Sequence, residues 1–388
     1  GELIIGDHGP TGAIYTLEAM PKDSKPSTFP KKLSESGLFE SVKEHRMKPG
    51  VIPYSVNAPF WSDGLHKERF LFLPDKETIG YTKTRAWTFP DKTVMVKSFA
   101  IDLEEGNPAT RKWIETRFFT KQQGEWFGYT YIWNEATGDG ELVPSAGLDK
   151  TFKVKTKDGM RDQVWHYPSR TECMVCHSRA AGFVLGLCSL QMNKTHDYGD
   201  VTDHQFRVFE HLGILKGFDW ATQAKEDLAA RAAAKKLTGK EADEYARIHG
   251  QQAGQREPKK NDMLPAFPDK LPRLVNPYDA KEDLTKRAKS WLHVNCASCH
   301  VEAGGGNAAM ELEYNTALDK MRLIDVKPIH TTLDIKDAKL VAPGSPDNSV
   351  LIKRLSTRGL NQMPPLSTYR TDDAGIALLK EWVGSLKK

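Results

Sequence analysis

Cys173-Met174-Val175-Cys176-His177 is the stretch that decides how the fold of this chain is interpreted. A second stretch of the same kind is Cys296-Ala297-Ser298-Cys299-His300. Both have the pattern Cys-x-x-Cys-His, which is the spacing of covalent c-type haem attachment. Two thiols one helical turn apart can add to the two vinyl groups of one porphyrin, and the His that follows becomes the proximal ligand of the iron. The sequence therefore predicts two covalently bound haem c groups, with cofactor-binding cysteines Cys173, Cys176, Cys296 and Cys299 and iron ligands His177 and His300.

Other uses of paired cysteines fit this chain less well. A zinc ribbon has two Cys-x-x-Cys pairs about 15–20 residues apart, whereas residues 177–295 separate the pairs here. A redox dithiol would leave the His after each pair unexplained. The fifth cysteine, Cys188, lies in an apolar stretch, where we expect a small buried side chain rather than a reactive thiol.

The composition is that of an ordinary globular protein, with 388 residues, of which 39% are hydrophobic and 27% charged. The formal net charge is +4, which the propionates of two haems would bring close to zero. Basic residues are interspersed with acids, so we expect no nucleic-acid-binding surface. No apolar run approaches the ~18–20 residues of a membrane span. Because haem is attached covalently outside the cytoplasm, we expect a periplasmic or otherwise extracytoplasmic bacterial protein that has lost an upstream part before Gly1.

The order of sequence patterns predicts a multidomain α+β protein, in which a β-sandwich or barrel-like domain precedes mostly α-helical c-type cytochrome domains. Residues 51–166 are rich in aromatic and β-branched residues, as in short strands. Helical periodicity is present at 203–215 and 281–294, and Thr371 is the expected N-cap of a final helix. The expected parts are a remnant of an upstream domain (1–26), a β domain (27–165), a first haem segment (166–217), a charged helical connector (218–275) and a cytochrome c domain with the second haem (276–388).

A low-spin electron carrier needs a second axial ligand on each iron, and a Met in this position raises the reduction potential. Met363 is the predicted sixth ligand of the second haem. It shortly precedes the final helix, and the two prolines after it stiffen the loop. A buried core Met is the structural alternative.

The sequence leaves the sixth ligand of the first haem open. Met192, past a glycine-bearing turn beyond His177, is the first choice, and an open site is a further alternative. The other candidates are Met263, His166, His196, His204 and His211. Arg170 and Arg179 flank the first motif, where each could pair with a haem propionate or be a solvated surface side chain.

Several stretches resemble a bacterial family of two-haem c-type cytochromes with an N-terminal β domain. They include Tyr167-Pro168-Ser169-Arg170 directly before the first motif, together with residues 57–64, 131–135, 190–193, 274–279 and 304–307. The resemblance covers about residues 30–388. Members of this family are often fused behind a propeller of the glucose/sorbosone dehydrogenase type, and residues 1–17 are similar to the closing strands of such a propeller.

The resemblance and the motifs together imply an electron-transfer module. Electrons from a sugar or alcohol dehydrogenase, fused or separate, would enter at the first haem, pass to the second and leave to a soluble acceptor. No catalytic residue is expected in the chain itself, although the chain could be part of a larger dehydrogenase. The alternative is a haem enzyme or sensor, peroxidase-like or gas-binding, with an open site at the first haem. A partner- or carbohydrate-binding β domain is a third option.

Overall fold

The structure, a computed structural model, describes residues 4–6, 14–16, 28–82, 86–218, 260–261, 270–366 and 368–387. The chain forms two compact units, Gly1–Lys31 and Lys32–Lys388. In the first unit, β1 (Ile4–Gly6) and β2 (Ile14–Thr16) pair as an antiparallel hairpin. The predicted connector 218–275 lies largely outside the described residues, and the candidate ligand Met263 lies wholly outside them. The predicted division of the second unit into separate domains stays a prediction.

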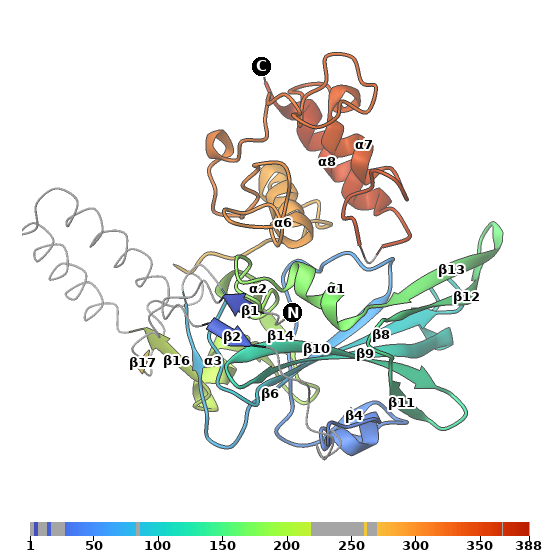
Figure 1. Cartoon of the computed structure of the whole chain (residues 1–388), viewed down its shortest axis with the longest axis vertical. Helices are drawn as coiled ribbons and strands as arrows, with labels where there is room; N and C mark the ends of the chain where they lie inside the picture. The colour runs from blue at the N-terminus through green and yellow to red at the C-terminus, as the bar shows by residue number, and fades with distance from the viewer. Residues whose placement is uncertain are drawn as a thin grey trace, which may run out of the picture. The chain divides into compact units, whose positions relative to one another are not determined.

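Among the described residues of the second unit, the largest sheet is antiparallel and has six strands (Figure 1). The β9–β10 turn consists of Gln123 and Gly124, whose positive φ angles of 53° and 82° suit a two-residue hairpin. The strands run in the order β11 (Asp139–Leu142), β10 (Glu125–Asn134), β9 (Arg111–Gln122), β8 (Val94–Asp102), β6 (His66–Phe72) and β5 (Ile52–Pro53).

Smaller sheets and two 3-10 helices complete the β-rich part of this unit. The helices are η1 (Leu33–Ser36) and η2 (Pro108–Thr110). The paired strands are β3 (Phe39–Ser41) with β4 (Arg46–Met47), β12 (Leu148–Thr156) with β13 (Gly159–Tyr167), β14 (Thr195–Asp197) with β15 (Thr202–His204), and β7 (Ile79–Gly80) with β16 (Leu215–Phe218) and β17 (Lys260–Asn261).

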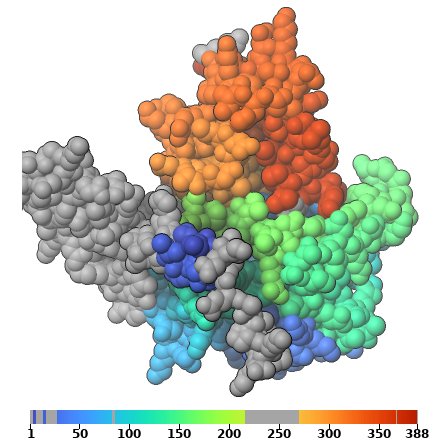
Figure 2. Space-filling view, viewed as in Figure 1, coloured from blue at the N-terminus to red at the C-terminus, as the bar shows by residue number. Residues whose placement is uncertain are grey.

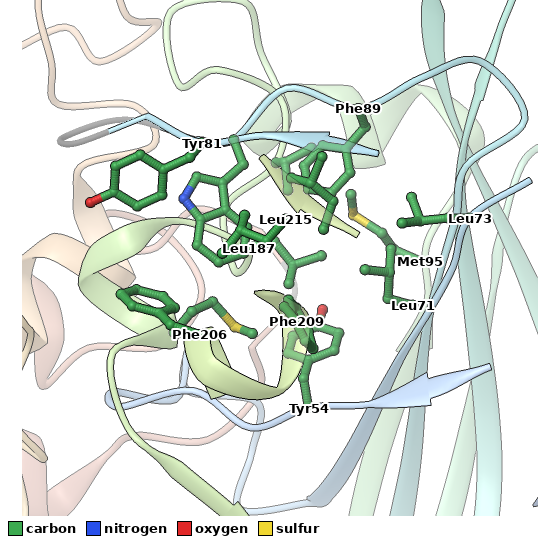
Figure 3. Close-up of a cluster of buried hydrophobic side chains, with 14 of the residues drawn as sticks. Tyr54, Leu71, Leu73, Tyr81, Phe89, Met95, Leu187, Phe206, Phe209 and Leu215 are labelled. Carbon is green, nitrogen blue, oxygen red and sulfur yellow. The ribbon is translucent and has the colours of Figure 1, made fainter. Parts of the chain in front are cut away.

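One face of the sheet packs against the segment that follows the first motif (Figure 3). Leu71 and Met95 of the sheet share a buried cluster with Phe206 and Phe209 of α3 (Gln205–His211). Each large apolar side chain buried in this way contributes about 1.5–3 kcal/mol to folding. The helix predicted at 203–215 is shorter than expected, because β15 precedes it and Gly213, at a φ of 68°, follows its end.

The segment beyond residue 270 contains α6 (Leu284–Cys296), α7 (Val350–Leu355) and α8 (Asp373–Ser385), with the short 3-10 helices η4 (Leu318–Lys320) and η5 (Pro346–Asn348). Trp291 of α6 and Trp382 of α8 lie in one buried cluster. The N-cap of α8 is Asp372 rather than Thr371. Its carboxylate accepts hydrogen bonds from the Gly375 amide at 2.9 Å and from the Trp291 indole at 2.7 Å.

The expectation of mostly α-helical cytochrome domains is wrong, because the fold is β-rich. Among the described residues, strand residues outnumber those in the six α-helices. In the predicted first haem segment, α1 (Arg170–Cys176), α2 (Ser189–Met192) and α3 have only 7, 4 and 7 residues. Helices α6, α7 and α8 cover less than a third of residues 276–388.

The loops between the helices explain this difference. Glycines at 304–306 and prolines at 364–365 do not support a continuous helix. Met321 and Leu323 are nevertheless fully buried, although neither belongs to an α-helix. Part of the core beyond residue 270 is therefore filled from irregular segments. In the described part of the chain, no helix combines the length and apolar character required to cross a bilayer.

Candidate functional site

The two Cys-x-x-Cys-His motifs open onto one cavity with a volume of about 850 Å³. This volume lies toward the upper end of the range of about 300–1,000 Å³ that is typical of ligand sites. The cavity wall comes partly from the sheet and partly from the segment beyond residue 270, which meets the residues around the first motif in Figure 2. Of the residues predicted to hold the cofactors, the lining includes Cys173, Cys176, His177, Cys296, Cys299, His300 and Met363.

The first motif lies on α1, which follows directly on strand β13. The Ser169 hydroxyl caps this helix by accepting from the Glu172 amide, and the Glu172 carboxylate accepts from the Ser169 amide at 2.7 Å. This reciprocal pair is a capping box and fixes where the helix starts. Strand β10 supports the helix through Gly128, where a Cβ atom would lie only 2.7 Å from the Cβ and Sγ atoms of Cys173. A glycine is therefore needed at this position to let Cys173 lie against the sheet.

Both motif histidines are held in the same way by a backbone carbonyl. His177 Nδ1 lies 2.5 Å from the Phe183 oxygen, and His300 Nδ1 lies 3.2 Å from the Ala308 oxygen. Because a carbonyl only accepts, each Nδ1 carries the proton. Neither Nε2 atom has a hydrogen-bond partner among the described residues. Metal-ligating histidines almost always donate their other ring N–H in this manner, which fixes the tautomer and aims the free nitrogen at the metal.

The backbone around the first histidine supports this geometry. Gly182 and Phe183 have φ angles of 73° and 60° in the turn that carries the Phe183 carbonyl. A left-handed conformation is uncommon for a large side chain such as Phe, and such conformations gather at functional sites. The His177 ring also packs on Phe119 of β9, with 4.3 Å between the ring centroids.

Burial keeps both histidines neutral. Burial, helped by the cations Lys97 and Arg117 and opposed by the hydrogen bond to Phe183, lowers the pKa of His177 to about 4. Burial also lowers the pKa of His300. Neutral imidazole is the form that binds a metal ion. Both side chains are therefore in the form that can bind a metal ion at neutral pH.

The second motif is packed against three consecutive glycines. A Cβ atom at Gly306 would lie 2.5 Å from His300 Nδ1, and one at Gly304 would collide with the Cys299 carbonyl oxygen. Gly305 between them faces open space. The loop after the motif can therefore follow the His300 ring closely only because Gly304 and Gly306 have no side chain.

The two motifs meet at their second cysteines. Cys299 Sγ lies 3.8 Å from the carbonyl oxygen of Val175, the residue before Cys176. Interaction between the two thiols raises the pKa of Cys176 and lowers that of Cys299 to about 6. Burial raises the pKa of Cys296 to about 12. The attachment points of the two predicted haems are thus adjacent within one cavity.

Met363 lies in a loop of the cavity wall that the chain fixes at several points. The Met363 amide donates to the Arg354 oxygen at 3.2 Å, and the Gln362 amide group donates to the Pro364 oxygen at 3.0 Å. Further along this loop, the Tyr369 and Arg370 amides donate to the Asp63 carboxylate at 2.9 and 3.0 Å. The β-rich part of the unit therefore anchors the loop that presents Met363 to the cavity.

The other candidate ligands within the described residues do not line the cavity. Met192 is fully buried in the cluster beneath the sheet, where Gln205 Nε2 lies 3.9 Å from its sulfur. Both ring nitrogens of His166 are paired, at 2.6 Å to Asp149 and 2.9 Å to Glu172. His196, His204 and His211 do not line the cavity either. We therefore do not propose any of these side chains as an iron ligand.

Two further side chains that could ligate iron line the cavity, although the sequence did not point to them. Met95 of β8 is directly paired with Phe119 of β9, the residue that packs on His177. His293 of α6 also lines the cavity, but its Nδ1 accepts from the Tyr314 amide at 3.2 Å, so its Nε2 carries the proton and does not ligate. Met95 is therefore the better thioether candidate for the first haem. In the sequence, nothing distinguishes Met95 from any other apolar residue of a strand.

The flanking arginines are not at the cavity either. The Arg170 guanidinium lies 5.0 Å from the ring centroid of Tyr129, and neither Arg170 nor Arg179 is part of the described lining. No group of three or more His, Cys, Asp or Glu side chains that could hold a bare metal ion is present among the described residues. A haem iron does not need such a group, because it takes at most two ligands from the protein. Comparison of the chain with protein-family models, with curated proteins and with solved structures found no match.

Proposed function

We propose that this protein is a two-haem c-type cytochrome that relays electrons outside the cytoplasm. The observation that carries the proposal is the paired geometry of the motifs. In each motif a neutral His has its Nδ1 fixed by a carbonyl and its Nε2 free, beside two cysteines in a shared cavity. Bound haem supplies reversible one-electron chemistry at its iron.

The residues of this chain would divide the task of holding two such groups. Cys173 and Cys176 would attach the first haem and Cys296 and Cys299 the second, with His177 and His300 as proximal ligands. Met363 is the proposed sixth ligand of the second haem. Apolar side chains of the cavity wall, among them Val184, Leu351 and Leu355, would pack against the porphyrins.

The contact between the two motifs supports a relay rather than two independent sites. Because Cys299 Sγ lies 3.8 Å from the carbonyl oxygen of Val175, next to Cys176, the two thioether edges would be neighbours and the path between the cofactors short. Under this proposal the electron donor is a sugar or alcohol dehydrogenase, fused or separate, and the acceptor is a soluble redox protein. The proposal includes membership of the two-haem family that the sequence resembles, and it assigns no bond-making step to the chain itself.

Haem stoichiometry tests the proposal directly. The full chain is produced in a bacterial periplasm together with the c-type maturation apparatus, and the intact mass is measured after denaturation. We expect the mass of two haems, of one haem in Cys173→Ala/Cys176→Ala and in Cys296→Ala/Cys299→Ala, and of two haems in the control Cys188→Ala. A wild-type chain that folds and carries no covalent haem would refute the proposal.

An open first site is the second candidate. Met192 lies outside the cavity, so the first haem would be six-coordinate only with another ligand, for which Met95 is the candidate. With an open first site the protein would be a haem enzyme or a gas sensor. The absorption spectrum of the reduced protein, before and after addition of carbon monoxide, separates the two functions. An unchanged spectrum supports the relay. A shift of half the haem, absent in Cys173→Ala/Cys176→Ala, supports an open site on His177.

A further inference from the structure

Three basic side chains form a row across the sheet on the face that lines the cavity. Arg69 of β6 is paired with Lys97 of β8, and Lys97 is paired with Arg117 of β9. All three line the cavity. We call Arg69, Lys97 and Arg117 the cation row. Like charges that face one another directly across strands destabilise a sheet, so this arrangement calls for a compensating anion.

The described residues provide only one carboxylate for this row. Glu115 accepts from the Arg117 guanidinium at 2.5 and 2.9 Å, and its second oxygen also accepts from the Trp165 indole at 2.9 Å. No ion pair to Arg69 or Lys97 is found in the described part of the chain. Lys97 instead lies 5.0 Å from the ring centroid of Phe99. Burial and the neighbouring cations Arg69, Lys67 and Arg117 hold the pKa of Lys97 well below its usual range.

The row is close to the first motif. Arg117 and Lys97 both act electrostatically on His177, and Arg117 also acts on Cys173 and Cys176. On the same sheet face, the neighbouring strand positions are Met95 and Phe119, and Phe119 contacts the His177 ring. Cys173 lies against Gly128 of β10, and β9, β8 and β6 follow in that order across the sheet, so the row leads away from the thioether positions. Because the propionates lie on the porphyrin edge opposite the thioethers, those of a haem attached through Cys173 and Cys176 would extend over this row.

We propose that Arg69, Lys97 and Arg117 form a carboxylate-binding site for the propionates of the haem attached at the first motif. This inference rests on the proposed function and adds to it a role for the sheet. A guanidinium fork matches a carboxylate in two parallel hydrogen bonds, and a desolvated ammonium regains its charge beside an anion. The two propionates would balance the charge that Glu115 leaves uncompensated. Arg170 and Arg179, which flank the motif in sequence, do not line the cavity.

The test uses the haem-loaded full chain and two readouts. Reduction potentials are measured for the wild type, Arg69→Gln and Lys97→Gln, and resonance Raman spectra record the propionate bending bands. The conservative variant Arg69→Lys keeps the charge. The control is Lys112→Gln, which removes a cation of the same strand β9 whose Nζ pairs with Glu135 at 2.8 Å away from the cavity.

We expect Arg69→Gln and Lys97→Gln to lower the potential of one haem, because an uncompensated propionate stabilises ferric iron. A tenfold change in the oxidation equilibrium corresponds to a shift of about 59 mV for a one-electron couple. The propionate bands should shift in the same two variants, while Arg69→Lys and Lys112→Gln should stay close to the wild type. The variant Cys296→Ala/Cys299→Ala keeps the first haem alone. Adding Arg69→Gln or Lys97→Gln to this variant should lower the potential of that remaining haem.

Each other outcome overturns the inference in a recognisable way. Two bound haems with unchanged propionate bands would show that the propionates lie elsewhere, even if a potential shifts through space, and would leave the proposed function intact. Conversion of one haem to high spin in Lys97→Gln would identify Lys97 as an iron ligand instead. A folded chain without covalent haem would overturn both the inference and the proposed function.

Discussion

The packing of His300 on Gly306 leads to a sharp prediction with a control one residue away. Adding a methyl group at Gly306 places a Cβ atom 2.5 Å from His300 Nδ1 and 2.7 Å from its Cε1, whereas a Cβ atom at Gly305 meets nothing within 4 Å. Neither glycine has a positive φ angle, so alanine fits the backbone at both sites. Gly306→Ala and Gly305→Ala therefore differ only in what the new methyl group touches.

The magnitude follows from the distance. Ordinary contacts of a Cβ atom begin at 3.4 Å, so the His300 ring or its loop must move by roughly 0.9 Å in Gly306→Ala, and overpacking of this kind costs about 1–3 kcal/mol. The 3.2 Å hydrogen bond to Ala308 is lost with the movement, which adds about 1 kcal/mol. Gly305→Ala should stay within about 0.5 kcal/mol of the wild type.

Urea denaturation of the haem-loaded chain measures the difference. Tryptophan fluorescence, to which Trp291 and Trp382 of the surrounding cluster contribute, follows unfolding. Under the proposed function, the haem spectrum would report the bond between His300 and the iron in the folded state. We expect a lower midpoint and a weakened second-haem spectrum only in Gly306→Ala. Equal midpoints and equal spectra for the two variants would refute the packing of His300 on the glycine loop.

Three further predictions concern ligation, buried polar contacts and acid stability. Met95→Ala should make the first haem of the reduced protein bind carbon monoxide, whereas Met192→Ala should only lower the stability; carbon monoxide binding in Met192→Ala alone would contradict the described cavity. Asp372→Ala should lower the free energy of unfolding by about 2–4 kcal/mol, because it leaves the buried Trp291 indole without its acceptor and removes a helix cap. Thermal unfolding checks this against the exposed neighbour in Asp373→Ala, and equal melting temperatures would argue against the Asp372 network. Hydrogen bonds from His45 and His66 lower the pKa of Glu68 from 4.5 to about 2, so its contribution to stability is present above about pH 4.5 and is lost as the pH falls to about 2. Wild type should lose more stability than Glu68→Gln across that acid window, and parallel denaturation curves would show that the two histidines do not stabilise the charged form.

The residues of the site that could be predicted are those whose chemistry depends on local spacing. The two cysteines and the histidine of each motif are neighbours in sequence, and all six lie at the cavity. Met363 was predictable from its place before the final helix. That these residues bind haem stays a prediction until the cofactor is measured.

The features that could not be predicted depend on strand pairing. Arg69, Lys97 and Arg117 are far apart in sequence and become neighbours only through the register of β6, β8 and β9. Met95 reaches the cavity for the same reason. Met192, by contrast, follows the first motif closely in sequence but packs beneath the sheet, because closeness along the chain does not determine which way a side chain points.

The helical content was predicted wrongly because two haem motifs suggested cytochrome domains of ordinary helical design. Residues such as Met321 and Leu323 are as buried as helix residues would be, and nothing in their composition distinguishes a packed loop from a helix. The glycines after the second motif were noted only through a family resemblance. Their physical reason, the close approach to His300, became visible in three dimensions.

The contact between Cys176 and Cys299 also constrains how the protein is made. Cysteines that lie this close to each other can be oxidised to a cystine in an oxidising compartment. Such a cross-link would consume one attachment point of each motif at once. Under the proposed function, haem must therefore reach the newly exported polypeptide before its two halves close, and the timing of maturation, rather than affinity for the cofactor, would set the yield of active protein.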